Sequence, residues 1–296
     1  MRQDITFTSG PDVCAGWFYM PEGATGDARF PVVVMAPGFS AVKEWGLNAV
    51  AERFCAAGHA VLLFDFRHFG ASGGMPRSQL FPQAMVEDYR NAISWVCRQP
   101  RVDQARLGVW GTSFSGGVAT YVATVDRRVK AVVAQVPSLL NAETRRNINP
   151  ARWEAVGAFL QADRIARYET GDVRTLPVVA ADGEPCALPG QESWDFFVAA
   201  SASTPTWRNE ITVESLEKIG EFDPVSLIHM LAPTALLVIA AEKDSLIPLA
   251  ALTKVVDRAA EPKRIAILPA GHFEVYSEPW FSTATNEAVI WFRTHL

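Results

Sequence analysis

Ser113 is the residue whose context most clearly suggests chemistry. A short apolar run, Arg106-Leu-Gly-Val-Trp, leads directly into Gly111-Thr-Ser-Phe-Ser115. A serine hydroxyl is a poor nucleophile unless a sharp strand-to-helix turn places it beside a base and beside free backbone N–H groups. Such a turn needs small residues two positions before and after the serine, and here these are Gly111 and Ser115. The spacing predicts a nucleophile elbow at Ser113, with Ser115 as a departure from the usual glycine.

Two other interpretations of this segment remain open, and a third fails. It could be an ordinary glycine-rich turn between a strand and a helix. Gly111 and Gly116 also have the spacing of a phosphate-binding loop, but position 117 is glycine where that loop needs lysine. Ser115 could instead be the nucleophile, although Gly111 would then have no role.

A base and an acid follow in the chain order that the elbow requires, which is serine, acid, histidine. The apolar run 233–241 is followed by Asp244, and the apolar run 264–269 is followed by His272. Side chains that follow parallel strands gather at one edge of an open α/β sheet. We therefore expect Ser113, Asp244 and His272 to form a catalytic triad.

Other acids and histidines are alternatives. Glu242 lies nearer the strand, and Asp223 precedes a proline at what looks like a helix start, where aspartate commonly caps. His68 follows a strand and could contact substrate. The remaining histidines have structural or solvated contexts: His59 opens a strand, His229 lies in a short helical stretch, and His295 is next to the last residue.

The oxyanion hole should consist of two backbone donors, and it usually supplies the largest catalytic contribution. One donor is expected to be the N–H of Phe114, directly after the serine. The other is expected from Phe39, in the loop Pro37-Gly-Phe-Ser that follows the third strand.

These motifs together resemble the α/β-hydrolase superfamily of serine hydrolases, over residues 13–137 and 223–296. The segments 37–45 and 65–74 and the elbow are most similar to dienelactone-hydrolase-like enzymes and to microbial polyketide thioesterases or acyl transferases. Pro37 stands where many members have histidine. The resemblance implies an α/β-hydrolase fold, in which a mostly parallel twisted sheet carries helices on both faces and an inserted cap.

The secondary structure expected from the sequence agrees with such a sheet. Apolar runs predict strands at 30–37, 60–66, 105–112, 129–136, 233–241 and 264–269, preceded by a hairpin over 3–8 and 13–20. Residues 45–57 and 81–98 have helical spacing, with Met85, Tyr89, Ile93 and Val96 on one face of the second. Alternating strands and helices indicate a parallel sheet between helical layers.

The alternation stops over residues 138–222, which we expect to form the cap, so that 1–137 and 223–296 form the core. This segment holds eight Lys or Arg and thirteen Asp or Glu, and it carries the acidity of the whole chain. Its aromatic residues favour an apolar roof over a pocket, with Trp153, Trp194 and Phe197 as candidate substrate contacts.

Composition narrows the class of protein. The chain of 296 residues is 49 % hydrophobic and 20 % charged, enough for one large core. The N-terminus lacks the apolar centre of a secretory signal, and no apolar run is long enough for a membrane helix. The four cysteines (14, 55, 97 and 186) are too scattered for a metal or redox motif, so a cytoplasmic location is expected. A net charge of −5 gives no electrostatic basis for binding nucleic acid.

The sequence thus predicts a serine hydrolase that acts on a carboxylic ester, thioester or lactone through an acyl-Ser113 intermediate. An acyl or polyketide transferase and a small-peptide hydrolase using an acidic cap residue are alternatives, and a non-catalytic binding protein is a third. Dehalogenase and epoxide hydrolase chemistry would need aspartate at position 113. No metal or organic cofactor is required, the expected partner is a small acyl substrate, and a homodimer is possible.

Overall fold

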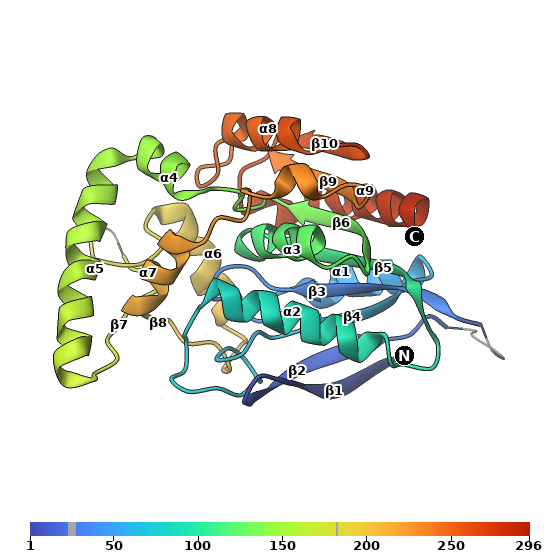
Figure 1. The fold of residues 1–296 in the computed structure, drawn as a ribbon, viewed down its shortest axis with the longest axis horizontal. Coiled ribbons are helices and arrows are strands. Elements are labelled where there is room, and N and C mark those ends of the chain that lie inside the picture. The colour runs from blue at the N-terminus through green and yellow to red at the C-terminus, as the bar shows by residue number, and fades with distance from the viewer. Residues whose placement is uncertain (23–27, 182) are drawn as a thin grey trace.

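The computed structural model describes residues 1–22, 28–181 and 183–296, and its centre is an eight-stranded sheet (Figure 1). In sheet order the strands are β1 (Arg2–Ser9), β2 (Asp12–Tyr19), β4 (Ala60–Phe64), β3 (Phe30–Ala36), β5 (Val102–Thr112), β6 (Val129–Gln135), β9 (Ala235–Ala241) and β10 (Lys263–Leu268). Strands β1 and β2 form an antiparallel hairpin, and β2 is also antiparallel to β4. The other six strands, from β4 to β10 in sheet order, are mutually parallel. The eight predicted strands are confirmed, with ends shifted by up to three residues.

Helices cover both faces of the sheet. One face carries α2 (Pro82–Val96), α3 (Phe114–Val125) and α8 (Leu249–Arg258), and the other carries α1 (Leu47–Ala56) and α9 (Trp280–His295). Strand residues alternate between the two layers: Val32 and Val34 pack with the first group, whereas Val33 and Met35 pack with the second. A strand buried on both faces is apolar at every position, and β3, β4 and β9 have this composition.

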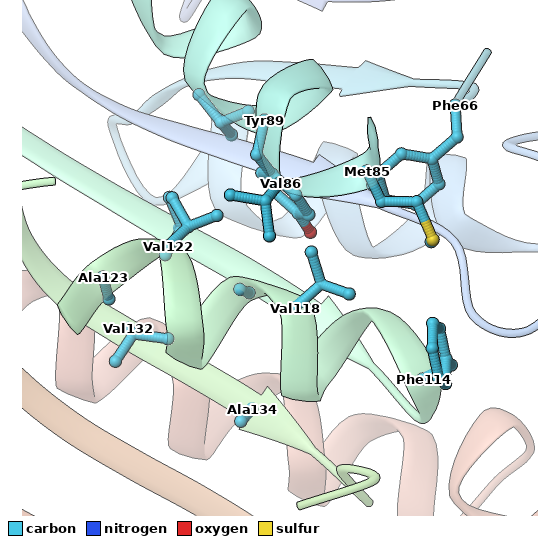
Figure 2. Close-up of a cluster of buried hydrophobic side chains, with 14 of the residues drawn as sticks. Phe66, Met85, Val86, Tyr89, Phe114, Val118, Val122, Ala123, Val132 and Ala134 are labelled. Atoms are coloured by element: carbon cyan, nitrogen blue, oxygen red, sulfur yellow. The ribbon is translucent and has the colours of Figure 1, made fainter. Parts of the chain in front are cut away.

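Tight packing between α2 and α3 fixes the start of α3, where Ser113 lies. Met85, Val86 and Tyr89 of α2 face Phe114, Val118 and Val122 of α3 (Figure 2). The Tyr89 hydroxyl donates to the carbonyl oxygen of Trp110 at 2.8 Å, which ties α2 to the end of β5. The helical face predicted from Met85, Tyr89, Ile93 and Val96 is buried as expected.

Residues 138–222 are here called the inserted segment, and the described residues of this segment lie beyond one end of the sheet (Figure 1). The segment leaves the sheet after β6, and therefore at the carboxyl ends of the parallel strands. It contains α4 (Ala142–Ile148), α5 (Pro150–Thr170), α6 (Gln191–Ser201) and α7 (Val213–Glu221), with the two-residue strands β7 (Thr175–Leu176) and β8 (Ile211–Thr212). Two 3-10 helices, η1 (Ile228–Met230) and η2 (Glu274–Tyr276), lie in later loops. Among the described residues, no helix is both long and apolar enough to cross a bilayer.

Candidate active site

Ser113 lies in the tight turn between β5 and α3, with a backbone φ of 52° and ψ of −119°. A positive φ is strained for a residue with a side chain, and such strain is held in place by its surroundings. A Cβ atom on Gly111 would lie 2.3 Å from the carbonyl oxygen of Ser115, so only glycine fits there. The turn therefore has the geometry that the sequence predicted.

Ser115 is fully buried, and its hydroxyl is used by the backbone. Its Oγ accepts a hydrogen bond from the Thr112 N–H and lies 2.9 Å from the carbonyl oxygen of Ala36. The serine that replaces the usual glycine thus joins the turn to the end of β3. Its hydroxyl has backbone partners, whereas the Ser113 hydroxyl is the one next to a histidine.

Ser113, His272 and Asp244 form a continuous hydrogen-bonded chain. His272 Nε2 lies 3.1 Å from Ser113 Oγ, and His272 Nδ1 lies 2.8 Å from Asp244 Oδ2. The histidine side chain is 1 % exposed and the aspartate side chain is fully buried. If Nδ1–H donates to the carboxylate, the Nε2 lone pair faces the serine hydroxyl, which is the tautomer a general base needs.

The loop after β9 fixes the Asp244 carboxylate. Its other oxygen, Oδ1, accepts the backbone N–H groups of Leu246 and Ile247, each at 2.8 Å. The two alternative acids have other positions. Glu242 is exposed, and Asp223 accepts the N–H of Val225 in a turn before η1 instead of capping the predicted helix.

The two expected oxyanion donors belong to segments that adjoin Ser113. Within the described residues, neither the Phe39 N–H nor the Phe114 N–H has a protein acceptor. A Cβ on Gly38 would lie 3.3 Å from Ser113 Cβ, so the loop after β3 packs directly against the serine. The phenyl rings of Phe39 and Phe114 meet edge to face with centroids 6.2 Å apart.

A buried ion pair supports the loop that carries Phe39. Lys43 Nζ lies 2.7 Å from Asp65 Oδ2, and the Lys43 backbone N–H donates to Asp65 Oδ1 at 2.7 Å. The Lys43 side chain is 3 % exposed and the Asp65 side chain is fully buried. Asp65 Oδ2 also accepts the N–H of Ala71, so one carboxylate holds together the loops after β3 and β4.

We expect Lys43→Met to lower the free energy of unfolding by about 3–5 kcal/mol, because the Asp65 carboxylate would remain buried without its cation. Urea unfolding monitored by circular dichroism measures this loss. Lys218→Met removes an exposed ion pair with Glu221 and serves as the control, with an expected loss below about 1 kcal/mol. The double variant Lys43→Met/Asp65→Asn should be more stable than Lys43→Met alone. Equal stability of these two would contradict a charged Asp65.

Ser113 and His272 open into a cavity of about 430 Å³ that is lined mainly by apolar side chains. The core contributes Phe39, Trp45, Phe114, Leu246, Ile247, Phe273 and Tyr276, and the inserted segment contributes Arg145, Ile148, Asn149, Arg152, Leu188, Pro189, Phe196, Phe197 and Ile219. Apolar lining of this kind is typical of small-molecule sites.

The charge of the cavity differs from the charge of the inserted segment as a whole. No Asp or Glu lines the cavity within the described residues, although acidic residues outnumber basic ones in the segment. The ionisable side chains that line it are Arg145, Arg152, His272 and Tyr276. Burial lowers the pKa of Arg145 to about 10, a shift that the negative charge of Asp223 partly opposes. Arg145 is therefore still a cation at neutral pH.

The structure brings only one of the four candidate substrate contacts into this cavity. Phe197 lines it and packs edge to face on Trp45, with ring centroids 5.1 Å apart. Trp194 packs against the core, and Trp153 is half-buried on α5; neither lines the cavity. His68 is hydrogen-bonded through Nδ1 to the carbonyl oxygen of Pro76 and shapes the loop after β4, outside the cavity, where burial lowers its pKa.

Other residues of the cavity were missed by the sequence analysis. Tyr276, four positions after His272, hydrogen-bonds Thr112 Oγ1 at 2.6 Å, and burial raises its pKa. Phe196 belongs to the aromatic residues expected to favour an apolar roof, although it was not singled out as a substrate contact, and it stacks on Phe273 with centroids 4.6 Å apart. Arg145 carried no motif that would have singled it out. Among the described residues, no group of three or more His, Cys, Asp or Glu side chains is arranged to hold a metal ion.

Comparison with known proteins places this geometry in a family. Residues 16–168 match the family described as X-Pro dipeptidyl-peptidase (S15 family), which is more than half of the chain. The chain belongs to the S15 family. A solved structure supports the architecture of this S15-family protein: the α/β hydrolase GrgF from Penicillium sp. superposes with a TM-score of 0.85 at 27 % identity, covering 100 % of this chain and 99 % of that one. The predicted α/β-hydrolase fold is thereby confirmed, and the protein is a hydrolase-class enzyme.

Two curated relatives of this S15-family protein cover nearly its whole length. A protein named Thiohydrolase from Eupenicillium brefeldianum is 30 % identical over 93 % of this chain and 89 % of its own. A protein named Polyketide transferase af380 from Aspergillus fumigatus is 29 % identical over 100 % of this chain and 99 % of its own. These similarities fit the narrower resemblance seen in the sequence.

Proposed function

We propose that this S15-family protein is a serine hydrolase that cleaves carboxylic esters, thioesters or lactones through an acyl-Ser113 intermediate. The observation that carries the proposal is the hydrogen-bonded chain from Ser113 Oγ through His272 to Asp244. Ser113 and His272 line an apolar cavity. The two uncommitted N–H groups beside Ser113 support it further.

In the proposed mechanism, Ser113 Oγ attacks the substrate carbonyl carbon while His272 Nε2 takes the hydroxyl proton. The negative charge that forms on the carbonyl oxygen is stabilised by the N–H groups of Phe39 and Phe114. His272 then gives its proton to the leaving oxygen or sulfur, which departs and leaves acyl-Ser113. A water molecule then attacks the carbonyl carbon of acyl-Ser113 while His272 takes its proton, and the carboxylic acid is released. Asp244 keeps the imidazole in the required tautomer and stabilises its protonated form.

The inserted segment is proposed to act as a cap that selects an apolar acyl group. Its residues Ile148, Leu188, Phe196 and Phe197 line the cavity that holds Ser113. The names of the relatives, Thiohydrolase and Polyketide transferase, favour thioesters among the possible substrates. The same names favour a second outcome, in which an alcohol replaces water and receives the acyl group.

Peptide hydrolysis is less well supported, although the family description names a dipeptidyl-peptidase. An enzyme that binds the amino terminus of a peptide needs an acidic side chain in its pocket to pair with the ammonium group. The described residues that line this cavity include arginines and no acid. We therefore propose acyl ester and thioester chemistry in preference to aminopeptidase chemistry.

A fluorophosphonate is expected to label the protein stoichiometrically on Ser113, as measured by intact mass and peptide mapping. The Ser113→Ala variant should remain unlabelled, whereas Ser115→Ala should still react. Incubation with matched esters and thioesters, with and without an added alcohol, then identifies the acyl group and separates hydrolysis from transfer. Absence of labelling in the folded wild-type protein would contradict the proposal.

A further inference from the structure

Arg145 is a half-buried cation of this cavity that the proposed mechanism does not use. It lies on α4 and lines the cavity that holds Ser113 and His272. Its Nη1 donates to the carbonyl oxygen of Ile219, at the C-terminal part of α7. Within the described part of the chain, no carboxylate lies within ion-pair distance of Arg145, and its other guanidinium nitrogens have no hydrogen-bond partner.

A half-buried guanidinium without a counter-ion is less stable than a paired one, because partial burial removes some of its water and no carboxylate replaces the lost interactions. Burial also lowers the pKa of Arg145, because it removes water from the charged guanidinium. Asp223 is the acid whose charge acts on Arg145, yet the two side chains do not form an ion pair. Water or a ligand from outside the folded chain must therefore complete the hydrogen bonding of Arg145.

The surroundings of Arg145 favour an anion. The neighbouring Arg152 also lines the cavity, as does the amide side chain of Asn149, and the described lining contains no acidic residue that would repel a negative charge. The planar guanidinium matches the two oxygens of a carboxylate or phosphate, to which it can donate a pair of parallel hydrogen bonds.

We infer that Arg145 binds an oxyanion group of the substrate, either a carboxylate or a phosphate, at a distance from the carbonyl that Ser113 attacks. The statement that this substrate reacts at Ser113 rests on the proposed serine-hydrolase function. The statement that Arg145 binds an oxyanion does not depend on that function. A carboxylate would sit on the far end of the acyl chain. A phosphate would belong to the pantetheine arm of a thioester leaving group. The chemistry that Arg145 recognises is the same in both cases.

Two matched substrate pairs distinguish these sources. The first pair is p-nitrophenyl hexanoate and mono-p-nitrophenyl adipate, which differ by a terminal carboxylate. The second pair is hexanoyl-pantetheine and hexanoyl-4′-phosphopantetheine, which differ by a phosphate. For the pair with the correct anion, we expect Arg145→Gln to lower the ratio of kcat/KM, anionic over neutral, by about 10- to 100-fold.

The variants are chosen to separate charge from structure. Glutamine at position 145 keeps a polar side chain with an N–H donor but carries no charge, and Arg145→Lys should recover part of the ratio. The matched control is Arg146→Gln, which removes an exposed charge from the same helix at a position that does not line the cavity. This control should leave the ratio unchanged in both substrate pairs. Melting temperatures of all variants identify any loss of folding.

Calorimetry in the Ser113→Ala background tests binding without any reaction. Monoethyl adipate is compared with diethyl adipate, and 4′-phosphopantetheine with pantetheine, with and without Arg145→Gln. A weakening of at least about 10-fold that is confined to one anionic ligand supports the inference and identifies the source of the anion, even if the proposed hydrolysis fails. Equal binding of anionic and neutral ligands in both pairs, unaffected by Arg145→Gln, would overturn it.

Discussion

Ser113→Ala and His272→Ala are each expected to reduce kcat/KM for ester hydrolysis by about four to six orders of magnitude. The hydroxyl and the imidazole act as a unit, because His272 Nε2 lies 3.1 Å from Ser113 Oγ and must take the proton of this hydroxyl for the attack to occur. The double variant should therefore be hardly slower than either single variant. Steady-state and single-turnover kinetics with p-nitrophenyl esters measure all three.

Ser115→Ala is the matched control for this prediction. The Ser115 hydroxyl bonds the backbone of Thr112 and Ala36, so its loss should reduce stability by about 1–3 kcal/mol and change activity by less than about 10-fold. If Ser115→Ala abolished activity while Ser113→Ala retained it, the nucleophile would lie two residues further along the chain. Additive losses in the double variant would show that Ser113 and His272 act independently.

Asp244→Asn is expected to reduce kcat by about four orders of magnitude while leaving the fold intact. The asparagine amide would donate to His272 Nδ1, which places the imidazole proton on Nε2 and removes the lone pair that must accept the serine proton. Its amide oxygen could still accept the N–H groups of Leu246 and Ile247, so the loop should keep its shape. Activity and melting temperature measured on the same preparation test both parts.

The control for the acid is Glu242→Gln. Glu242 is exposed, two positions from Asp244, and its substitution should leave activity within about 2-fold of the wild type. An Asp244→Asn enzyme with near-normal activity would transfer the acid role to another carboxylate, and Asp223 would be the next to test.

The parts of the molecule that were predictable from sequence depend on short stretches of chain. The elbow belongs to one continuous segment, in which local sterics decide the conformation. This segment includes strand β5 with Gly111 and Thr112 at its end. Asp244 and His272 were predictable because each follows a parallel strand, and all such positions meet at one sheet edge. The strand order then fixes their proximity without further information.

The cavity wall was not predictable in the same way. Whether Phe197 or Trp194 lines the cavity depends on the rotation of α6, which is set by contacts of Phe197 with Trp45 and Trp207. Arg145 and Tyr276 acquire their roles from neighbours that are distant in sequence, Ile219 and Thr112 respectively. His68 was expected near the substrate because its strand ends at the right edge, but its loop turns the ring toward Pro76 instead.

The inserted segment departs after β6 and the chain re-enters the sheet at β9, and these two strands are neighbours in the sheet. An excursion whose ends lie side by side can grow, shrink or be exchanged without changing the order of any strand. Many of the residues that line the cavity thus come from a single uninterrupted stretch of the amino-acid sequence, whereas Ser113, Asp244 and His272 lie outside it. Natural variation in that stretch can change which molecules enter the cavity while the reacting groups stay constant.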